Sequence, residues 1–174
     1  AYPPGASLPQ PLPWPALGID AANQQRLLSS LGLDGERPLL GICPGAEFGP
    51  AKQWPGVHYG ALAETYIRRG WQVVALGSAN DKASVTAIAE HLDPALRSQF
   101  CDASGATSLV DAVDLLALCK GAVSNDSGLM HIAAAVGCPL VAVSGSTSPG
   151  FTPPLAPQVA VASIDLSGRP CFER

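Results

Sequence analysis

The sequence predicts an α/β fold built on a parallel sheet. Short runs that are almost entirely apolar alternate with segments of helical pattern along the chain. Within these runs apolar and polar residues do not alternate, which is typical of strands buried on both faces. Helices between such strands would cover both faces of the sheet. Together these observations predict a Rossmann-like, three-layer domain.

The first elements follow a proline-rich segment. Asp20 is placed to cap a helix through AANQQRLLSSL, and Gly32 would end this helix. Residues 38–43 (PLLGIC) predict a buried strand, which a loop rich in glycine and proline follows. Residues 58–69 predict an amphipathic helix ended by Gly70, with two arginines in its last turn, where cations favour the helix dipole.

The second half of the chain continues the alternation. An irregular piece that includes Phe100 and Cys101 leads to a helix over 107–119, where Ser108 with Asp111 resembles a capping box. The other expected elements are strands at 71–77, 121–125, 139–145 and 159–163 and helices at 81–92 and 127–137.

The two ends of the chain predict its domain organisation. The first fifteen residues contain six prolines, and each proline fixes φ and stiffens the chain. We therefore expect an interdomain linker over 1–16 and a single domain over 17–174. The chain begins without methionine and stops in a loop, so we expect that a domain preceding the linker is absent from it.

The composition argues against several classes of partner. A net charge of −4, with only three lysines and seven arginines, gives no basic footprint for nucleic acid. The longest apolar stretch, 129–143, is too short for the ~20 residues that a membrane span needs. The five cysteines stand singly, without metal-ligand spacing, so we expect buried thiols, a cytoplasmic protein and no metal.

The strand-to-helix loops are where we expect the site. There is no phosphate-binding Walker loop, no Gly-x-Gly-x-x-Gly after the first strand and no Gly-x-Ser-x-Gly elbow. Ligands of open parallel sheets bind at the carboxyl ends of the strands. The polar loops at these ends are PGAEFGPAK, GSAND, SNDSG and SGSTSPG.

The loop SNDSG predicts a phosphate site at the start of a helix. Unpaired N–H groups of Ser127, Gly128 and Leu129 could hold a pyrophosphate, since the helix dipole attracts anions. His131 would share a helical face with Gly128. The alternative is structural: Asp126 or Ser127 caps the helix and His131 is a half-buried core residue.

The loop PGAEFGPAK offers a second phosphate contact, through Lys52 as a flexible point charge. Lys52 as a plain surface residue is the alternative. Glu47 could be an acid–base group, but we favour a carboxylate that stabilises the loop. We expect Trp54 to serve packing and not ligand stacking.

Longer motifs carry a resemblance to a known family. From about Leu12 to Pro154 the chain resembles the heptosyltransferases of lipopolysaccharide core assembly, glycosyltransferase family 9. The motifs are CPGAEFGPAKQWP, LGSANDK and SNDSGLMHIAAAVGCPLVAVSGSTSPGFTPP. The resemblance implies the GT-B architecture, two Rossmann-like domains with the active site between them. Residues 17–174 would be the nucleotide-sugar domain, and the acceptor domain would be absent.

The resemblance also implies a reaction. L-glycero-D-manno-heptose would pass from ADP-heptose to the first heptose of the lipopolysaccharide inner core, with inversion and with neither metal nor cofactor. Lys52 would contact the diphosphate, Asp126 the sugar hydroxyls and the backbone of 127–129 the pyrophosphate, and His131 would assist. The general base would be an aspartate of the absent domain, so this chain would bind donor without turnover.

Weaker assignments complete the implied site. Ser78, Asn80 or Asp81 would lie near the ribose or the sugar, and Thr107 and Ser108 would line the adenine pocket. The resemblance places the whole enzyme at the cytoplasmic face of the inner membrane, as a peripheral protein. Alternatives are the transferase of the first heptose, a nucleotide-sugar epimerase that prefers uridine, or a non-catalytic nucleotide-binding module.

Overall fold

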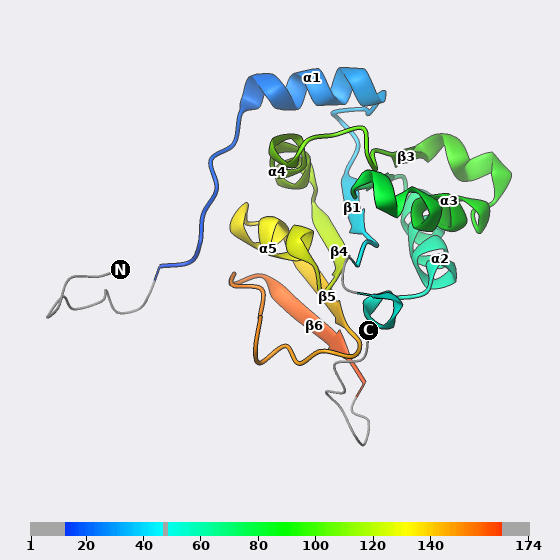
Figure 1. Ribbon diagram of the computed structural model, residues 1–174. Helices are drawn as coiled ribbons and strands as arrows, with labels where there is room; N and C mark the ends of the chain where they lie inside the picture. The colour runs from blue at the N-terminus through cyan, green and yellow to red at the C-terminus, as the bar shows by residue number, and fades with distance from the viewer. Residues whose placement is uncertain (1–12, 47–48, 165–174) are drawn as a thin grey trace, which may run out of the picture.

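The computed structural model describes residues 13–46 and 49–164, and its centre is one parallel sheet (Figure 1). The strand order is β3-β2-β1-β4-β5-β6, and all five pairings are parallel. The strands are β1 (Leu39–Cys43), β2 (Gln72–Ala75), β3 (Phe100–Asp102), β4 (Gly121–Asn125), β5 (Leu140–Ser144) and β6 (Val159–Ser163).

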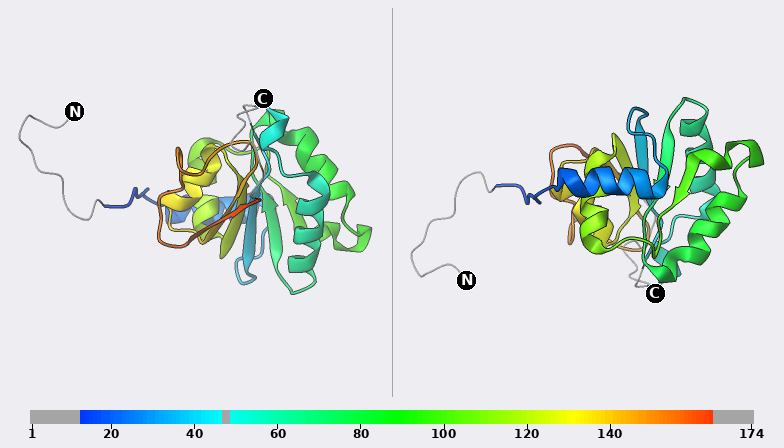
Figure 2. Two further views of the ribbon diagram at one scale, coloured as in Figure 1. Left: turned by 90° about the horizontal axis from the view of Figure 1, so that it is seen from below. Right: turned by 90° about the horizontal axis from the view of Figure 1, so that it is seen from above.

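Helices cover both faces of the sheet, which confirms the predicted fold class. Helices α2 and α3 pack on one face, and α1, α4 and α5 lie on the other (Figure 2). The α-helices are α1 (Ala21–Leu31), α2 (Gly56–Ile67), α3 (Lys82–Glu90), α4 (Leu109–Leu118) and α5 (Gly128–Ala135). Short 3₁₀ turns are η1 (Pro50–Lys52), η2 (Ala79–Asp81) and η3 (Pro94–Gln99).

Two apolar cores lie on the two sides of the sheet. The core under α2 and α3 includes Tyr59 and Ile88, both fully buried. The core under α4 and α5 includes the thiols of Cys43, Cys119 and Cys138, all of them buried and outside any disulfide. This placement confirms the prediction of buried thiols for those three cysteines. Cys101 is only partly buried, and Cys171 lies outside the described residues.

The first helix forms as its end signals predict. The Asp20 carboxylate accepts hydrogen bonds from the backbone N–H groups of Ala22 and Asn23, at 2.9 and 3.2 Å. Gly32 follows the helix with φ of 64°, a left-handed conformation that glycine adopts without steric cost. Upstream of this cap, the Leu17 N–H donates to the carbonyl of Ala135 at 3.0 Å, which joins Leu17 to the end of α5. The linker boundary at residue 16 stays a prediction.

The predicted helices and strands agree with the structure to within two residues at each end, and two differences change how an element is interpreted. Helix α2 begins at Gly56, two residues early, directly after Pro55, and ends at Ile67, so the two arginines follow the helix. Residues 100–102 are not irregular but form the edge strand β3, which pairs with β2. This strand has only three residues, is partly exposed and ends on an aspartate, so it leaves no apolar run in the sequence.

The parallel sheet gathers its strand-to-helix loops at one edge. Because every strand runs in the same direction, the loops after β1, β2, β4 and β5 all leave from the carboxyl edge. In the described part of the chain, no helix has the length and apolar character needed to cross a membrane.

Candidate functional site

Lys52 and Asp126 meet at the carboxyl edge of the sheet. Lys52 lies on η1 after β1, and Asp126 directly follows the neighbouring strand β4. Lys52 Nζ donates to Asp126 Oδ2 at 3.1 Å, with the side chains 19% and 14% exposed. The two residues that the sequence predicted in separate loops therefore form one largely shielded ion pair.

Thr147 joins this pair from the loop after β5. Its Oγ1 donates to Asp126 Oδ2 at 2.5 Å, and its own carbonyl accepts from Ser144 Oγ at 3.0 Å. The sequence indicated the loop SGSTSPG as a candidate but gave no reason to select Thr147 within it. The contact joins residues 21 positions apart, which no local pattern reveals.

Asn125, the residue before Asp126, is a buried polar residue that connects β4 to the loop after β1. Its side chain is fully buried, and its Oδ1 accepts from the backbone N–H of Trp54 and from the Tyr59 hydroxyl, both at 3.0 Å. Its Nδ2 donates to the carbonyl of Pro44 at 2.7 Å. One side chain thus fixes the end of β4 to both ends of the loop that carries Lys52.

The start of α5 has no side-chain cap. Ser127 makes no capping hydrogen bond, and its Oγ instead lies 3.4 Å from Ser124 Oγ. A Cβ added to Gly128 would meet nothing within 4 Å, so packing inside the protein does not require glycine there. His131 is exposed three positions further on. The structural alternatives, a capping role and a half-buried core histidine, are therefore wrong.

Asp81 sits where the ends of β1 and β2 adjoin. Its Oδ2 accepts from the backbone N–H and the hydroxyl of Ser78, at 2.7 and 2.8 Å. A Cβ on Gly45 would lie 2.6 Å from Asp81 Oδ1, and a Cβ on Gly77 would lie 2.8 Å from the Asp81 Cβ. These two glycines therefore leave the space that Asp81 occupies. Asn80 is exposed on the same turn.

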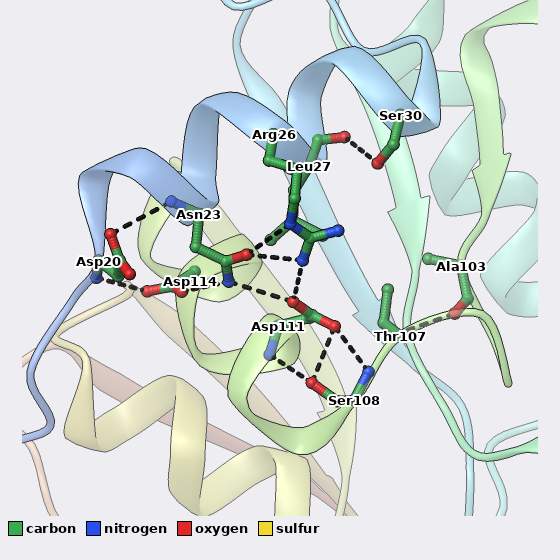
Figure 3. A network of polar contacts seen from close by, with 10 residues as sticks. All are labelled: Asp20, Asn23, Arg26, Leu27, Ser30, Ala103, Thr107, Ser108, Asp111 and Asp114. Atoms are coloured by element: carbon green, nitrogen blue, oxygen red, sulfur yellow. Dashed lines mark hydrogen bonds and ion pairs between the residues drawn. The ribbon is translucent and has the colours of Figure 1, made fainter.

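Thr107 and Ser108 have structural partners of their own (Figure 3). Ser108 Oγ donates to Asp111 Oδ2 at 2.8 Å and accepts from the Asp111 N–H at 3.1 Å, which confirms the predicted capping box. Thr107 Oγ1 donates to the carbonyl of Ala103 at 3.2 Å. These hydroxyls shape the loop before α4, and a place for them in an adenine pocket stays a prediction.

Helix α1 is fastened to α4 by the rest of the same network (Figure 3). Asp114, 1% exposed, accepts from the Asp20 N–H at 2.8 Å and from Asn23 Nδ2 at 2.6 Å. Arg26 pairs with Asp111 at 2.5 Å. Hydrogen bonds from the Ser108 backbone, the Ser108 side chain and Asn23, in that order, lower the pKa of Asp111 to about 2.

The remaining groups at this edge are held neutral or serve packing. Burial raises the pKa of Cys43 to about 12 and also raises the pKa of Tyr59, so neither is a candidate acid or base at neutral pH. Trp54 stacks on His58 at 5.4 Å and meets Tyr59 edge-on at 4.8 Å, which confirms its packing role. Glu47 lies outside the described residues.

The described residues contain no group of three or more His, Cys, Asp or Glu placed to hold a metal ion. Lys52 and the uncapped helix start offer donors for anions, which suits a phosphate and not a cation. Metal independence stays a prediction.

Comparison with known proteins extends over nearly the whole chain. The sequence is 49% identical over 157 residues to lipopolysaccharide heptosyltransferase 2 of Salmonella typhimurium, covering 90% of this chain and 45% of that protein. It is 47% identical to lipooligosaccharide heptosyltransferase 2 of Haemophilus influenzae over 154 residues, 86% of this chain and 44% of that protein. The chain thus spans about half the length of the curated relatives it matches.

A solved structure and a family model agree with these relatives. The structure of E. coli ADP-heptose lps heptosyltransferase II superposes with a TM-score of 0.86 at 46% identity, over 91% of this chain and 48% of that one. The sequence model of glycosyltransferase family 9 (heptosyltransferase) matches residues 3–174. The chain therefore belongs to glycosyltransferase family 9.

Proposed function

We propose that this chain is the donor-binding half of a heptosyltransferase that uses ADP-heptose. The acceptor would be the first heptose of the lipopolysaccharide inner core, as expected for relatives of the second heptosyltransferase type. The observation that carries the proposal is the convergence of Lys52, Asp126 and the uncapped start of α5 at one edge of the sheet. This edge offers positive charge for a diphosphate next to an acceptor for hydroxyls.

Diphosphate would bind at the start of α5. Its oxygens would accept hydrogen bonds from the N–H groups of 127–129, where the helix dipole favours negative charge. The open space beside Gly128 would let the oxygens reach the backbone. Lys52 would contribute an ammonium from the neighbouring loop, which stabilises the charge that develops on the leaving ADP.

The sugar and nucleoside would be held by the loops on either side. Asp126 would accept from sugar hydroxyls, and the exposed His131 would assist from one helical turn further along. Asp81, with Ser78 and Asn80 beside it, would face the ribose or the sugar. Thr107 and Ser108 would border the adenine.

The proposed reaction is an inverting displacement without metal or cofactor. The acceptor hydroxyl oxygen attacks the anomeric carbon, the bond from that carbon to the diphosphate oxygen breaks, and ADP leaves. A general base must take the acceptor proton. The curated relatives are more than twice as long as their matched regions, and we place the base in the part of such a protein that this chain does not contain.

The proposed partners fix where the whole protein would work. ADP-heptose is the soluble donor, and the lipopolysaccharide acceptor is anchored in a membrane. We therefore place the protein at the cytoplasmic face of the inner membrane, attached peripherally during catalysis and without a role for nucleic acid.

Calorimetric titration of this chain with ADP, UDP and ADP-heptose tests the proposal. We expect ADP to bind at least tenfold more tightly than UDP, about 1.4 kcal/mol, and ADP-heptose to bind more tightly than ADP. Preference for UDP would favour the epimerase. If ADP and ADP-heptose bind equally, the sugar makes no contact with this domain and the donor assignment of Asp126 fails.

A further inference from the structure

The Asp126 carboxylate is held from one side only. Among residues 13–46 and 49–164, both hydrogen bonds to this carboxylate, from Lys52 Nζ and from Thr147 Oγ1, go to Oδ2. The shorter of the two, at 2.5 Å, comes from Thr147. Oδ1 accepts no hydrogen bond from these described residues, so Oδ1 is the carboxylate oxygen available to an outside hydroxyl.

The two donors to Oδ2 belong to segments that pack together. Ser144 Oγ closes the loop of Thr147 by donating to its carbonyl at 3.0 Å. A Cβ on Gly145 would lie 2.8 Å from the carbonyl oxygen of Ala51, the residue before Lys52. The backbone of the loop after β5 therefore lies directly against η1, and glycine at 145 permits this approach.

The two donors respond differently to an arriving diphosphate. Lys52 carries a mobile point charge on a long stem, so a diphosphate draws it away from Asp126. Thr147 has a neutral hydroxyl on a β-branched side chain with few rotamers, and a phosphate exerts far less pull on it. When Lys52 turns to the ligand, Thr147 is the donor that remains on Oδ2.

We propose that Thr147 is a positioning residue, which keeps Asp126 in place so that Oδ1 accepts a hydroxyl of the donor sugar while Lys52 binds the diphosphate. The inference rests on the proposed function, because it concerns the same site and the same donor. It assigns Thr147 to recognition of the sugar and not of the nucleotide, and this assignment separates it from a residue that only supports the loop.

The test compares Thr147→Val, which keeps the shape and loses the hydroxyl, with Thr147→Ser, which keeps the hydroxyl. Titration should show that Thr147→Val weakens ADP-heptose binding about tenfold, the scale of a hydrogen bond to a charged group. Binding of ADP should change less than about twofold, and Thr147→Ser should restore most of the ADP-heptose affinity. Equal losses for ADP and ADP-heptose would reduce Thr147 to loop support and overturn the inference.

A double-mutant cycle of Thr147→Val with Asp126→Ala, which removes the acceptor oxygen altogether, gives a readout that needs no ligand. We expect the two substitutions to be non-additive in the unfolding equilibrium constant from urea titration, by about fivefold or more. Additivity would mean that the contact does not form, and the inference would fall whatever the ligand is. If the cycle is non-additive but the unsubstituted chain binds ADP-heptose no better than ADP, the proposed function fails and Thr147 still positions Asp126.

Discussion

Lys52 Nζ lies 3.1 Å from Asp126 Oδ2, so the cation that we assign to the diphosphate is already paired with a carboxylate. Any diphosphate that reaches this edge competes with Asp126 for Lys52 and is repelled by Asp126 itself. The two residues of the pair should therefore have opposite effects on nucleotide binding, although they share one contact.

Replacing Lys52 by alanine should weaken ADP binding by about 1–3 kcal/mol, because a charged hydrogen-bond donor is lost from the site. The matched control is Lys120→Ala, which removes an exposed lysine just before β4, at the opposite edge of the sheet. Calorimetry with both variants checks the prediction. Equal ADP affinities in the two variants would remove Lys52 from the site.

Replacing Asp126 by asparagine should affect the affinity for ADP and the affinity for ADP-heptose in different ways. The ADP affinity should stay the same or rise, because the competing negative charge disappears and Lys52 is released. The ADP-heptose affinity should fall about tenfold, because an amide oxygen is a weaker acceptor for a hydroxyl than a carboxylate. A fall in ADP affinity as large as that for ADP-heptose would contradict the separate roles.

Substitution of Gly128 should damage binding without damaging the fold. A Cβ there meets open space, so Gly128→Ala should leave the free energy of unfolding unchanged or raise it by up to about 1 kcal/mol. The same methyl group would stand between the diphosphate and the backbone N–H groups, and Gly128→Val should abolish ADP binding. Gly121→Ala, at the other end of β4, is the control that should bind ADP normally. Normal binding by Gly128→Val would refute the helix-start site.

Asn125→Leu should destabilise the chain by about 3 kcal/mol, measured by urea unfolding. The substitution removes the hydrogen-bond partner of the Trp54 N–H and of the buried Pro44 carbonyl, and leaves the Tyr59 hydroxyl only a long contact of 3.5 Å with the Cys43 carbonyl. Tyr59→Phe should cost less, about 1 kcal/mol, because Asn125 keeps its other two hydrogen bonds. A larger loss of stability for Tyr59→Phe than for Asn125→Leu would show that Asn125 is not the centre of these hydrogen bonds.

Asp111 should make stability depend on pH in the acid range. Hydrogen bonds from Ser108 lower its pKa from 3.8 to about 2, so the folded state favours the ionised form. The resulting stability is present above about pH 4 and is lost as the pH falls towards 2. The unfolding free energy of the unsubstituted chain should exceed that of Asp111→Asn by a constant amount above pH 4. If the difference in unfolding free energy at pH 2 is as large as it is above pH 4, packing and not ionisation causes it.

Local signals predict the elements that have strong ends or long apolar runs. Asp20 and Gly32 mark both ends of α1, and the Ser108 and Asp111 pair marks the start of α4. Strand β3 escapes such reasoning, since an edge strand of three residues is recognised only through its pairing with β2. The predicted start of α2 lies two residues too late, because a glycine after Pro55 predicts a loop when it is considered alone.

The candidate site divides in the same way. Lys52, Asp126 and Gly128 could be selected from the sequence because each follows a predicted strand and either carries a charge or lacks a side chain that would block the backbone. Thr147 and Asn125 could not, because their roles arise from contacts that link distant loops. The space for Asp81 between two glycines likewise depends on the adjacency of β1 and β2, which the order of residues along the chain does not give.

The rate at which the buried thiols react with a reagent reports how often the native structure opens. Cys43, Cys119 and Cys138 are at most 5% exposed, and burial raises the pKa of Cys43 to about 12 and that of Cys138 to about 11. An alkylating reagent therefore finds neither access nor thiolate in the native state. The rate at which these three thiols are modified, followed by mass spectrometry, would measure how often α4 and α5 separate transiently from the sheet. The measurement needs no introduced label. A bound nucleotide that stabilises the carboxyl edge of the sheet should slow the modification of these thiols.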